Sequence, residues 1–429
     1  GYVFGFPILL MDATMQASTT EPYPCGLGGP VNRFAQLFDP PGPDFRAVVR
    51  PNVDTLYSSA FLDLTNGPMM LDVPAIEDRF YLMAMLDAWT NNFAGPGSQT
   101  NGGAATTYLI AGPDWQGGAP DGAELIKAPT NIVWIIGRTE LKDADDIDAA
   151  NAIQRQYKLY PQGGEPIAPP ETECRPVSEM TEPEAQVKSW DGPAFFSRLD
   201  QVMDRYPPSD TARGHLTENL TLIGVGDDAD TPVDDLPDDV KSALSKGIEL
   251  GQKTLDAAFS VSGEFSAWSP DPTKVSLGDY GDDFLVRGVV SQIGFGANRS
   301  EFATYQNATK DKDLDTLDGA AHDYALMFED SKTPPVDAFW SVTVYNKDGF
   351  LIENDIHRYA LGSNSSLIKS EDGAIRIALS PEKPPETPEE NWLPIPEGPF
   401  QVTLRMYAPK DAILNGDWRA PPITKADEQ

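Results

Sequence analysis

The sequence is poor in cysteine, histidine and basic residues, and it lacks a long apolar run. Its 429 residues include two cysteines and three histidines, and 32 basic residues stand against 66 acidic ones. No apolar stretch reaches the roughly 18 residues of a membrane span, so no membrane-spanning helix is expected. The formal net charge of -34 repels phosphate backbones and anionic surfaces, so we expect no nucleic-acid partner.

These scarcities also exclude several kinds of site. The histidines are far apart, and neither His-Glu-x-x-His nor Cys-x-x-Cys spacing occurs. The Gly-x-Ser-x-Gly nucleophile elbow and the Gly-x-x-x-x-Gly-Lys phosphate loop are absent as well. Asp311, Asp313 and Asp315 begin like a calcium loop, but Thr316 and His322 replace the glycine and glutamate that such a loop needs. We therefore expect no cofactor and no metal, and a solvated acidic turn at 311–315.

The two cysteines, Cys25 and Cys174, either form one disulfide or stay free, and the sequence leaves both states open. A single even pair is compatible with an oxidising compartment. The sequence begins at Gly1 and not at methionine, so we expect a processed or trimmed start, from which any signal peptide would be missing.

What the sequence does contain is a globular share of apolar residues and many turn formers. Apolar residues make up 40%, and 39 prolines and 36 glycines are spread along the chain. This density suits short strands joined by turns better than a helical bundle. A chain of this length has room for two or three domains.

Apolar periodicity divides the chain into a strand-rich start, a helical middle and a strand-rich end. The first part begins with a predicted helix over residues 2–17, packed on the first domain, and a covering loop over 21–43. Short apolar runs at 69–73, 80–86, 106–111 and 131–137 are bounded by turn residues and predict an antiparallel sandwich.

A further helix is predicted at 146–157, and a Pro- and Glu-rich linker follows at 161–183. Helices are then predicted from Asp191, from Asp239 and over 284–293. Period-two alternation returns at 339–345, and strands are predicted at 350–352, 374–379 and 400–407. We interpret this end of the chain as a second sandwich of jelly-roll topology.

Several motifs occur in an order that resembles two families of domains of unknown function. Residues 52–57 (Asn-Val-Asp-Thr-Leu-Tyr), Gly67-Pro68, the run 80–90 and Pro96-Gly97 resemble family 1254. Phe339-Trp340, Tyr345, Gly349-Phe350, Arg358-Tyr359, Asn391-Trp392, 398–400 and 404–407 resemble family 1214, its usual partner. The correspondence is poorest in the helical middle.

This resemblance implies a mainly β fold with a helical insertion, an N-terminal immunoglobulin-like β-sandwich and a C-terminal jelly-roll β-sandwich. We therefore expect domains at 1–145, 146–310 and 311–429. Members are mostly bacterial and often carry export signals, so a periplasmic or secreted location is expected. The resemblance implies no agreed activity and no catalytic residues.

Polar side chains gather at predicted strand ends in both β domains. Residues 50–64 begin with a polar head and run into a buried strand, which is typical of a binding loop on a rigid scaffold. We expect two such sets to face each other across a cleft between the domains. The first set is Arg50, Asn52, Asp54, Tyr57, Asp87, Trp89, Asn91 and Asn92, and the second is Trp340, Tyr345, Asn354, His357 and Arg358.

Asp54, Asp87, His357 and Arg358 are the candidate catalytic residues, and the others would bind substrate. Asp54 or Asp87 would act as a general base if burial raised its pKa. Arg50 or Arg358 would hold an anionic or carbonyl group. Each residue also has a structural reading, in which Asp54 orders a turn, Arg358 is its buried partner and the tryptophans belong to the core.

Three classes of function stay open on these grounds. We favour a cofactor-independent hydrolase or lyase acting on a small organic or glycan-type molecule. The alternatives are a non-catalytic small-molecule or glycan-binding protein and an envelope interaction protein. An enzyme should hold a carboxylate of raised pKa in a deep cleft, a binding protein should have an aromatic-lined pocket without one, and a structural protein should have no sizeable pocket. Whether the chain forms a homo-oligomer is left open.

Overall fold

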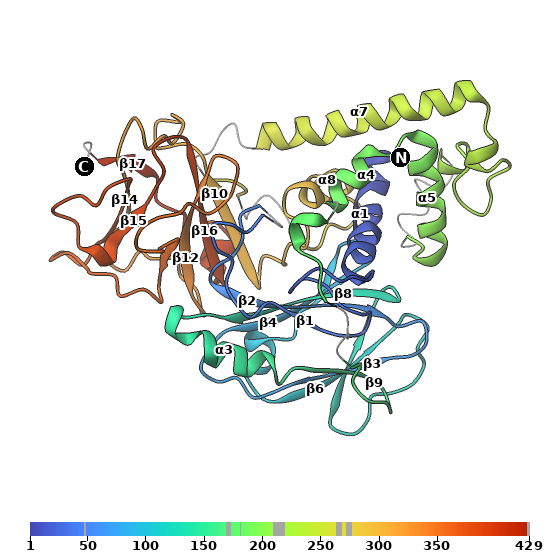
Figure 1. Ribbon diagram of the computed structural model, residues 1–429, viewed down its shortest axis with the longest axis horizontal. Coiled ribbons are helices and arrows are strands. Elements are labelled where there is room, and N and C mark those ends of the chain that lie inside the picture. Colours follow the sequence, from blue (N-terminus) through green and yellow to red (C-terminus); the bar gives the residue numbers. More distant parts are fainter. Residues whose placement is uncertain are drawn as a thin grey trace.

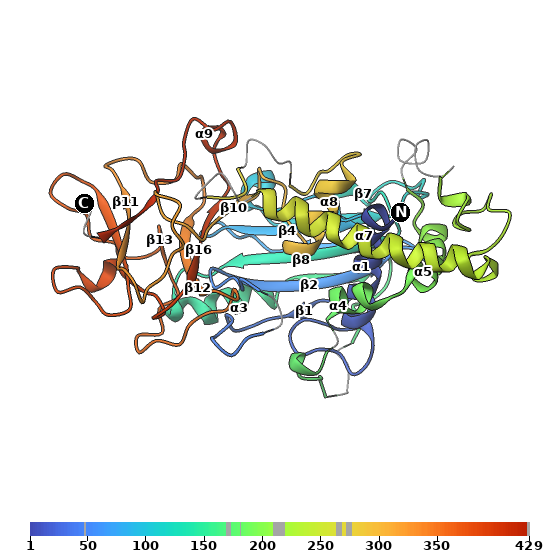
Figure 2. The ribbon, with the colours of Figure 1, turned by 90° about the horizontal axis from the view of Figure 1, so that it is seen from above.

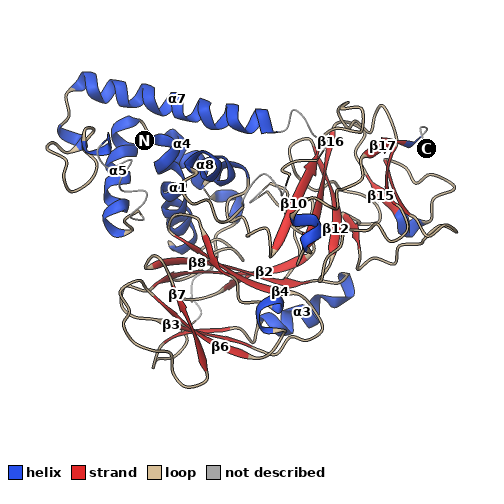
Figure 3. Cartoon of the chain, turned by 180° about the vertical axis from the view of Figure 1, so that it is seen from behind, coloured by secondary structure: helices blue, strands red, loops and turns tan. Residues whose placement is uncertain are grey.

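The computed structural model of the protein has three parts: two β-rich domains and a group of helices (Figures 1 and 3). It describes residues 1–46, 49–168, 173–180, 182–208, 219–262, 268–271 and 277–426. In Figure 1 the N-terminal β domain lies at the bottom, the helices at the upper right and the C-terminal β domain at the upper left. The predicted mainly β fold with a helical insertion is confirmed.

The N-terminal β domain consists of two sheets that share one hydrophobic core. The larger sheet has the strand order β1-β2-β8-β4-β5 and the smaller one β7-β6-β3-β9. Their strands are β1 (Ala35–Gln36), β2 (Thr55–Asp63), β3 (Met69–Val73), β4 (Tyr81–Asp87), β5 (Asn92–Ala94), β6 (Thr106–Ala111), β7 (Ala123–Lys127), β8 (Ile132–Glu140) and β9 (Lys158–Pro161). Leu71, Met83 and Ile135 lie in the shared core. Most pairs are antiparallel as predicted, but β6 and β7 run parallel.

The second face of the larger sheet is buried too. Its side chains, such as Leu82 and Ile136, pack with Phe302 and Tyr407 of the C-terminal half and with Met11 near the start of the chain. All seven residues of β4 are buried. A strand covered on both faces is apolar without alternation, which is why residues 80–86 form a continuous apolar run.

The helical group contains α1 (Tyr2–Thr19), α4 (Pro183–Ser189), α5 (Gly192–Arg205), α7 (Asp238–Ser262) and α8 (Phe284–Ile293). Figure 2 shows α7 lying along the group from above. α1 is apolar nearly all round and is therefore enclosed by the others, with Phe6 and Leu9 in a core that also holds Phe195 and Leu199. The predicted start at Asp191 is confirmed, because its side chain accepts from Ala194 N and caps α5. α1 reaches the first domain through Met11, so it belongs to both packing layers.

The C-terminal β domain also consists of two sheets around one core. Their strand orders are β10-β16-β12-β13 and β15-β14-β11-β17. The strands are β10 (Ala303–Ala308), β11 (Tyr324–Phe328), β12 (Trp340–Asn346), β13 (Ala360–Gly362), β14 (Ile375–Ser380), β15 (Trp392–Pro394), β16 (Phe400–Tyr407) and β17 (Ile423–Lys425). Leu326, Val342 and Leu404 lie between the sheets. The immunoglobulin-like and jelly-roll topologies stay predictions.

The short helices lie outside the helical group: α2 (Ser98–Asn101), α3 (Ile147–Gln154) and α9 (Asp411–Leu414). The predicted strand at 350–352 is wrong. This segment is held as a loop, because Asn354 Nδ2 donates to the carbonyls of Ile352 and Arg358. Such side-chain bonds compete with strand pairing. None of the helices in the described ranges is long and apolar enough to cross a bilayer.

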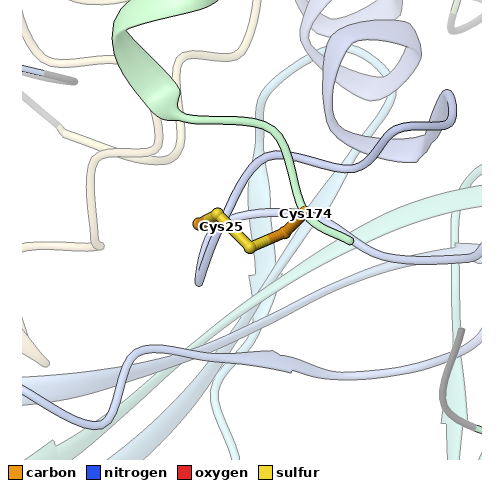
Figure 4. Close-up of a disulfide and its surroundings, with 2 residues drawn as sticks. All are labelled: Cys25 and Cys174. Carbon is orange, nitrogen blue, oxygen red and sulfur yellow. A yellow bond between two sulfur atoms is a disulfide. The ribbon is translucent and has the colours of Figure 1, made fainter. Parts of the chain in front are cut away.

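Cys25 and Cys174 form a disulfide with their Cα atoms 5.0 Å apart (Figure 4). It joins the covering loop before β1 to the linker predicted at 161–183, of which residues 169–172 and 181 lie outside the described residues. Backbone hydrogen bonds flank the bridge, because Cys25 N donates to Arg175 O at 3.0 Å and Arg175 N donates to Tyr23 O at 2.7 Å. The question that the sequence left open is resolved in favour of the pair.

Reducing this disulfide should destabilise the fold. The bridge closes a loop of 149 positions in the unfolded chain, so its loss should lower the free energy of unfolding by about 2–5 kcal/mol. Urea unfolding with and without a reductant measures this change. A variant carrying both Cys25→Ser and Cys174→Ser should unfold at the reduced protein's midpoint and ignore the reductant, and an unchanged wild-type midpoint on reduction would contradict the expectation.

Candidate functional site

The loop before β2, residues 50–54, is inserted into the C-terminal β domain. The carboxylate of Asp54 accepts a 2.6 Å hydrogen bond from Ser341 Oγ on β12. Asn52 Nδ2 donates to Tyr407 OH on β16 at 2.8 Å, and Tyr345 OH donates to the loop backbone at 2.7 Å. Polar groups at the mouth of β2 are thus matched by polar groups on the facing sheet.

Arg405 of β16 supplies the positive charge beside Asp54. Its Nη2 donates to Arg50 O at 3.0 Å and to Tyr345 OH at 2.7 Å, and its Nη1 donates to Thr343 Oγ1 at 2.7 Å. Burial raises the pKa of Asp54, and the nearby guanidinium of Arg405 and the serine hydrogen bond act against this rise. These groups bond to one another, so the contact holds the two β domains together and is filled by protein.

Arg358 and His357 lie elsewhere, on the surface of the C-terminal domain. Arg358 Nη1 donates to the carbonyls of Glu389 and Trp392, the latter at 3.1 Å. The His357 side chain is 75% exposed, and its Nδ1 is 3.6 Å from Glu353 Oε1. Their contacts tie a surface loop to its neighbour in the same domain, and the structure does not bring them to Asp54.

The side chains of Trp340 and Tyr57 each take part in a packing contact. Trp340 is buried, with its ring centroid 4.9 Å from that of Phe328, and it is one of the residues that line a surface groove of about 260 Å³. The ring of Tyr57 lies against the guanidinium of Arg138, 5.4 Å from its centroid. The residues of the two predicted sets therefore lie in different places: in the contact between the β domains, in a surface loop of the C-terminal domain, and around a pocket beside Asp87.

A separate cavity of about 160 Å³, which we call the Asp87 pocket, lies between the N-terminal β domain and the helices. Asp87, Trp89 and Asn91 of the predicted set line it. Its other lining residues are Pro129, Thr130, Pro207, Pro208, Gly281, Phe284 and Arg287. Rings and prolines thus form apolar walls, and two opposite charges and an amide form a polar end.

Asp87, the last residue of β4, orders the loop at the pocket's polar end. Its Oδ1 accepts from Trp89 N and Asn91 N, both at 2.9 Å, and its Oδ2 accepts from Asn91 Nδ2 at 2.9 Å. Aspartate commonly forms such local bonds to the backbone that follows it. The same loop turns through Thr90, whose φ of 70° is in the left-handed region.

Arg287 of α8 approaches the same loop from the helical side. Its Nη1 donates to Trp89 O, and its Nη2 donates to Gly281 O at 2.8 Å. The guanidinium is 5.3 Å from the Tyr280 ring centroid and 5.9 Å from that of Phe284. A charged residue on this helix therefore joins the two layers that form the pocket.

Burial dominates the electrostatics of this pair. It raises the pKa of Asp87, against the hydrogen bonds from Asn91 and the charge of Arg287. It lowers the pKa of Arg287, against the charges of Asp87 and of nearby acidic residues. Both shifts favour the neutral forms, as expected when two charges leave water.

Several buried polar atoms around this loop have no partner among the described residues. They are Thr90 Oγ1, Asn92 Oδ1, Asn92 Nδ2 and Arg287 Nε. Thr90 and Asn92 flank Asn91, which lines the cavity. A buried polar atom without a hydrogen bond costs about 1–3 kcal/mol, so such a cluster marks a place where a ligand or ordered water would be stabilised.

The sequence prediction missed Arg287, Thr130, Ser341 and Arg405. The two arginines had a usable signal, because each is the only charged residue of its helix or strand. A charge in such a place is seldom buried without a partner. Thr130 and Ser341 carried no comparable signal.

The acidic segment that resembles a calcium loop contains a lysine contact. Asp311 Oδ1 accepts from Asp313 N and Asp315 N, and Lys425 Nζ lies 3.4 Å from Asp311 Oδ2. Asp311 is fully buried, whereas residues 312–316 are exposed, so only the first carboxylate departs from the solvated turn expected there. Within the described part of the chain, no group of three or more acidic, His or Cys residues is arranged to hold a metal ion.

Two family models match the chain. DUF1254, a protein family of unknown function, matches residues 31–161, and DUF1214, another of unknown function, matches residues 302–411. Together the matches span more than half of the chain, in the predicted order. The chain belongs to the proteins that pair a DUF1254 domain with a DUF1214 domain.

One solved structure shares the fold of nearly the whole chain. The crystal structure of the VPA0106 protein from Vibrio parahaemolyticus is 23% identical, with a TM-score of 0.71 over 99% of this chain and 98% of that one. An uncharacterised protein from Burkholderia cenocepacia is 12% identical, with a TM-score of 0.47 over 99% of this chain and 89% of that one. No curated protein matches the sequence.

The buried hydrogen bond between the β domains should contribute measurably to stability. Ser341→Ala removes a 2.6 Å bond to the buried carboxylate of Asp54, and we expect a loss of about 1.5–3 kcal/mol in the free energy of unfolding. Ser370→Ala is the matched control, because Ser370 makes a 2.6 Å bond to Asp372 in an exposed turn. Chemical denaturation should place the control within about 0.5 kcal/mol of wild type, and equal effects of the two variants would contradict a special role for the buried bond.

The raised pKa of Asp87 predicts the sign of a pH effect. The folded protein binds this proton more tightly than the unfolded chain, whose value is near 3.8. The contribution of Asp87 to stability is therefore greatest below pH 3.8 and falls as the pH rises through the raised pKa. Asp87→Asn has no such loss, so its free energy of unfolding relative to wild type should increase over that interval.

Asp78→Asn provides the opposite control for this measurement. The hydrogen bond with Arg79 lowers the pKa of Asp78, so wild type gains stability from this group as the pH rises. The free energy of unfolding of Asp78→Asn relative to wild type should therefore decrease as the pH rises. Unfolding curves at a series of pH values give both slopes. An Asp87 slope with the sign of the Asp78 slope would show that the hydrogen bonds of the loop outweigh burial.

Proposed function

We propose that the protein binds a small organic molecule in the Asp87 pocket, with its apolar part against the rings and prolines and a hydrogen-bond acceptor at the polar end. The observation that carries this proposal is a cavity of about 160 Å³ whose lining combines the charged side chains of Asp87 and Arg287 with aromatic rings and three prolines. Cavities of about 150 Å³ hold a molecule of benzene size. The ligand is therefore of the size of a single ring, and a glycan would enter through one residue at most.

The state of Asp87 favours binding over catalysis. Its two oxygens already accept three hydrogen bonds from Trp89 and Asn91 in its own loop. A general base needs an oxygen within reach of the proton that it removes. Asp87 thus has a sufficient role in holding the binding loop, and the non-catalytic alternative ranks first.

A cofactor-independent hydrolase or lyase is the second candidate, and one observation favours it. The pocket contains a carboxylate whose pKa is raised by burial, together with Arg287. In this scheme Asp87 would accept a proton from water or from a ligand carbon. Arg287 would stabilise negative charge on the ligand's carbonyl oxygen.

Ligand binding should depend on Arg287. We expect Arg287→Gln to weaken the binding of pocket ligands about tenfold or more, because one charge-assisted hydrogen bond is lost. Arg299→Gln is the control, since Arg299 pairs with Glu301 at 2.9 Å at a partly exposed site. Native mass spectrometry for a co-purified molecule and ligand-observed NMR with small carboxylic acids, amides and esters provide the measurement.

The same panel separates the two candidates. An enzyme should turn over a bound ester or amide, and Asp87→Asn should abolish turnover while binding persists. A binding protein should show no turnover in wild type. A panel without any ligand that Arg287→Gln affects would contradict the pocket itself.

We also propose a periplasmic or secreted location. The pairing of Cys25 with Cys174 supports it, because disulfides persist in oxidising compartments and are rare in reducing ones.

A further inference from the structure

The surface groove of about 260 Å³ lies at one end of the C-terminal β domain, where its two sheets meet. In one sheet, β11 ends at Phe328, which pairs with Ile375, the first residue of β14. In the other sheet, β12 begins at Trp340 and β13 ends at Gly362. The rings of Trp340 and Phe328 join the two sheets. The segments that flank these strand ends therefore surround the groove, an arrangement typical of binding sites on a rigid scaffold.

The lining of this groove is rich in hydroxyl groups. They belong to Ser331, Thr333, Ser363 and Ser365. Glu329 and Lys369 add one charge of each sign, so the lining selects neither an anion nor a cation. Leu367 and Ile375 supply an apolar part. The groove thus differs from the Asp87 pocket, whose walls are formed by rings and prolines.

Two of the hydroxyl groups are held in place by the backbone. Ser363 Oγ accepts from Trp340 N and Ser365 Oγ accepts from Gly362 N, both at 3.0 Å. Within the described chain Ser365 Oγ acts only as an acceptor, so its O–H is able to donate to a ligand. Hydroxyl groups that are already fixed lose little freedom when a ligand binds, which favours affinity.

The other two hydroxyl groups and the Trp340 indole make no hydrogen bond to the described residues. Ser331 is exposed and Thr333 is half-buried, so both hydroxyls are accessible. Trp340 is 4% exposed, and its Nε1 is not one of the fully buried atoms without a partner, so its N–H faces the groove. Ser331 also has a φ of 60°, a left-handed conformation that is uncommon outside glycine and that clusters at ligand sites.

We propose that this groove binds one neutral sugar ring, which is either a free monosaccharide or the end of a glycan. A pyranose ring presents hydroxyl groups around its rim and C–H groups on its faces. Serine and threonine hydroxyls both donate and accept, so they match the rim, and Leu367 and Ile375 match an apolar face. A cavity of about 150 Å³ holds a molecule of benzene size, so a groove of about 260 Å³ has room for one ring with its substituents.

This site goes beyond the proposed function, because no residue lines both the groove and the Asp87 pocket. The groove belongs to the C-terminal β domain, whereas the pocket lies between the N-terminal β domain and the helices. A substitution in one site should therefore leave binding at the other unchanged, and Arg287→Gln should bind sugar as wild type does.

The experiment measures sugar binding by ligand-observed NMR and calorimetry. The probes are D-glucose, D-galactose, D-mannose and N-acetyl-D-glucosamine, each alone and as the end of a disaccharide. We expect saturable binding of at least one of them to wild type. Binding of the monosaccharide alone identifies a free sugar as the ligand, and tighter binding of the disaccharide identifies a glycan end.

The first variant combines Ser331→Ala with Thr333→Val. It removes two hydroxyl groups that bond to nothing in the described chain, so the Tm should stay unchanged while Kd rises about tenfold or more. Ser366→Ala is the matched control, because Ser366 is an exposed serine next to Ser365 that does not line the groove. Its Kd should stay within about twofold of wild type, since it removes no contact with the ligand.

A second variant tests the groove by volume and does not depend on the strength of any hydrogen bond. Thr333→Trp places a large side chain at a half-buried position of the lining, and it should abolish sugar binding while the Tm is kept. Three results would overturn the proposal: no neutral sugar binds saturably to wild type, Kd is unchanged in both groove variants, or binding is lost in Arg287→Gln instead. The last result would place the sugar in the Asp87 pocket.

Discussion

The central strands β2, β4 and β8 are covered on both faces, and the rest of the structure depends on this constraint. One face packs on the smaller sheet of the same domain, and the other packs on α1 and on the C-terminal half. Arg138 and Asp87 on these strands are therefore removed from water and need hydrogen-bond partners within the protein. Arg138, Asp87 and the loop around Asp54 all meet this requirement in different ways.

Asp54 is paired by Ser341 and Arg405 from the C-terminal domain, and the result is a domain contact. Asp87 is paired mostly by its own loop, and Arg287 from α8 closes a small cavity over it. These two strand ends carry similar residues in the sequence. The difference between a filled contact and an open pocket comes from the partner that packs on each.

Much of the fold was accessible from local sequence patterns. β3, β6, β16 and α8 have the bounds predicted from turn residues and apolar spacing, because these signals are local. The strand predicted at 350–352 failed, since the side-chain bonds of Asn354 outweigh a short apolar run. The site was accessible only in part: Asp87, Trp89 and Asn91 come from one predicted loop, but Arg287 lies about two hundred residues away and no single-sequence pattern connects them.

The placement of α1 has a consequence for the order of folding. Phe6 and Leu9 pack on Phe195, Leu199 and Leu255, so the partners of this helix are made long after the helix itself. During synthesis the strongly apolar α1 segment is therefore exposed before its native partners exist. Contacts between residues so far apart in the sequence also form slowly. The nascent chain therefore needs protection against aggregation at this segment until the residues through α7 have been made.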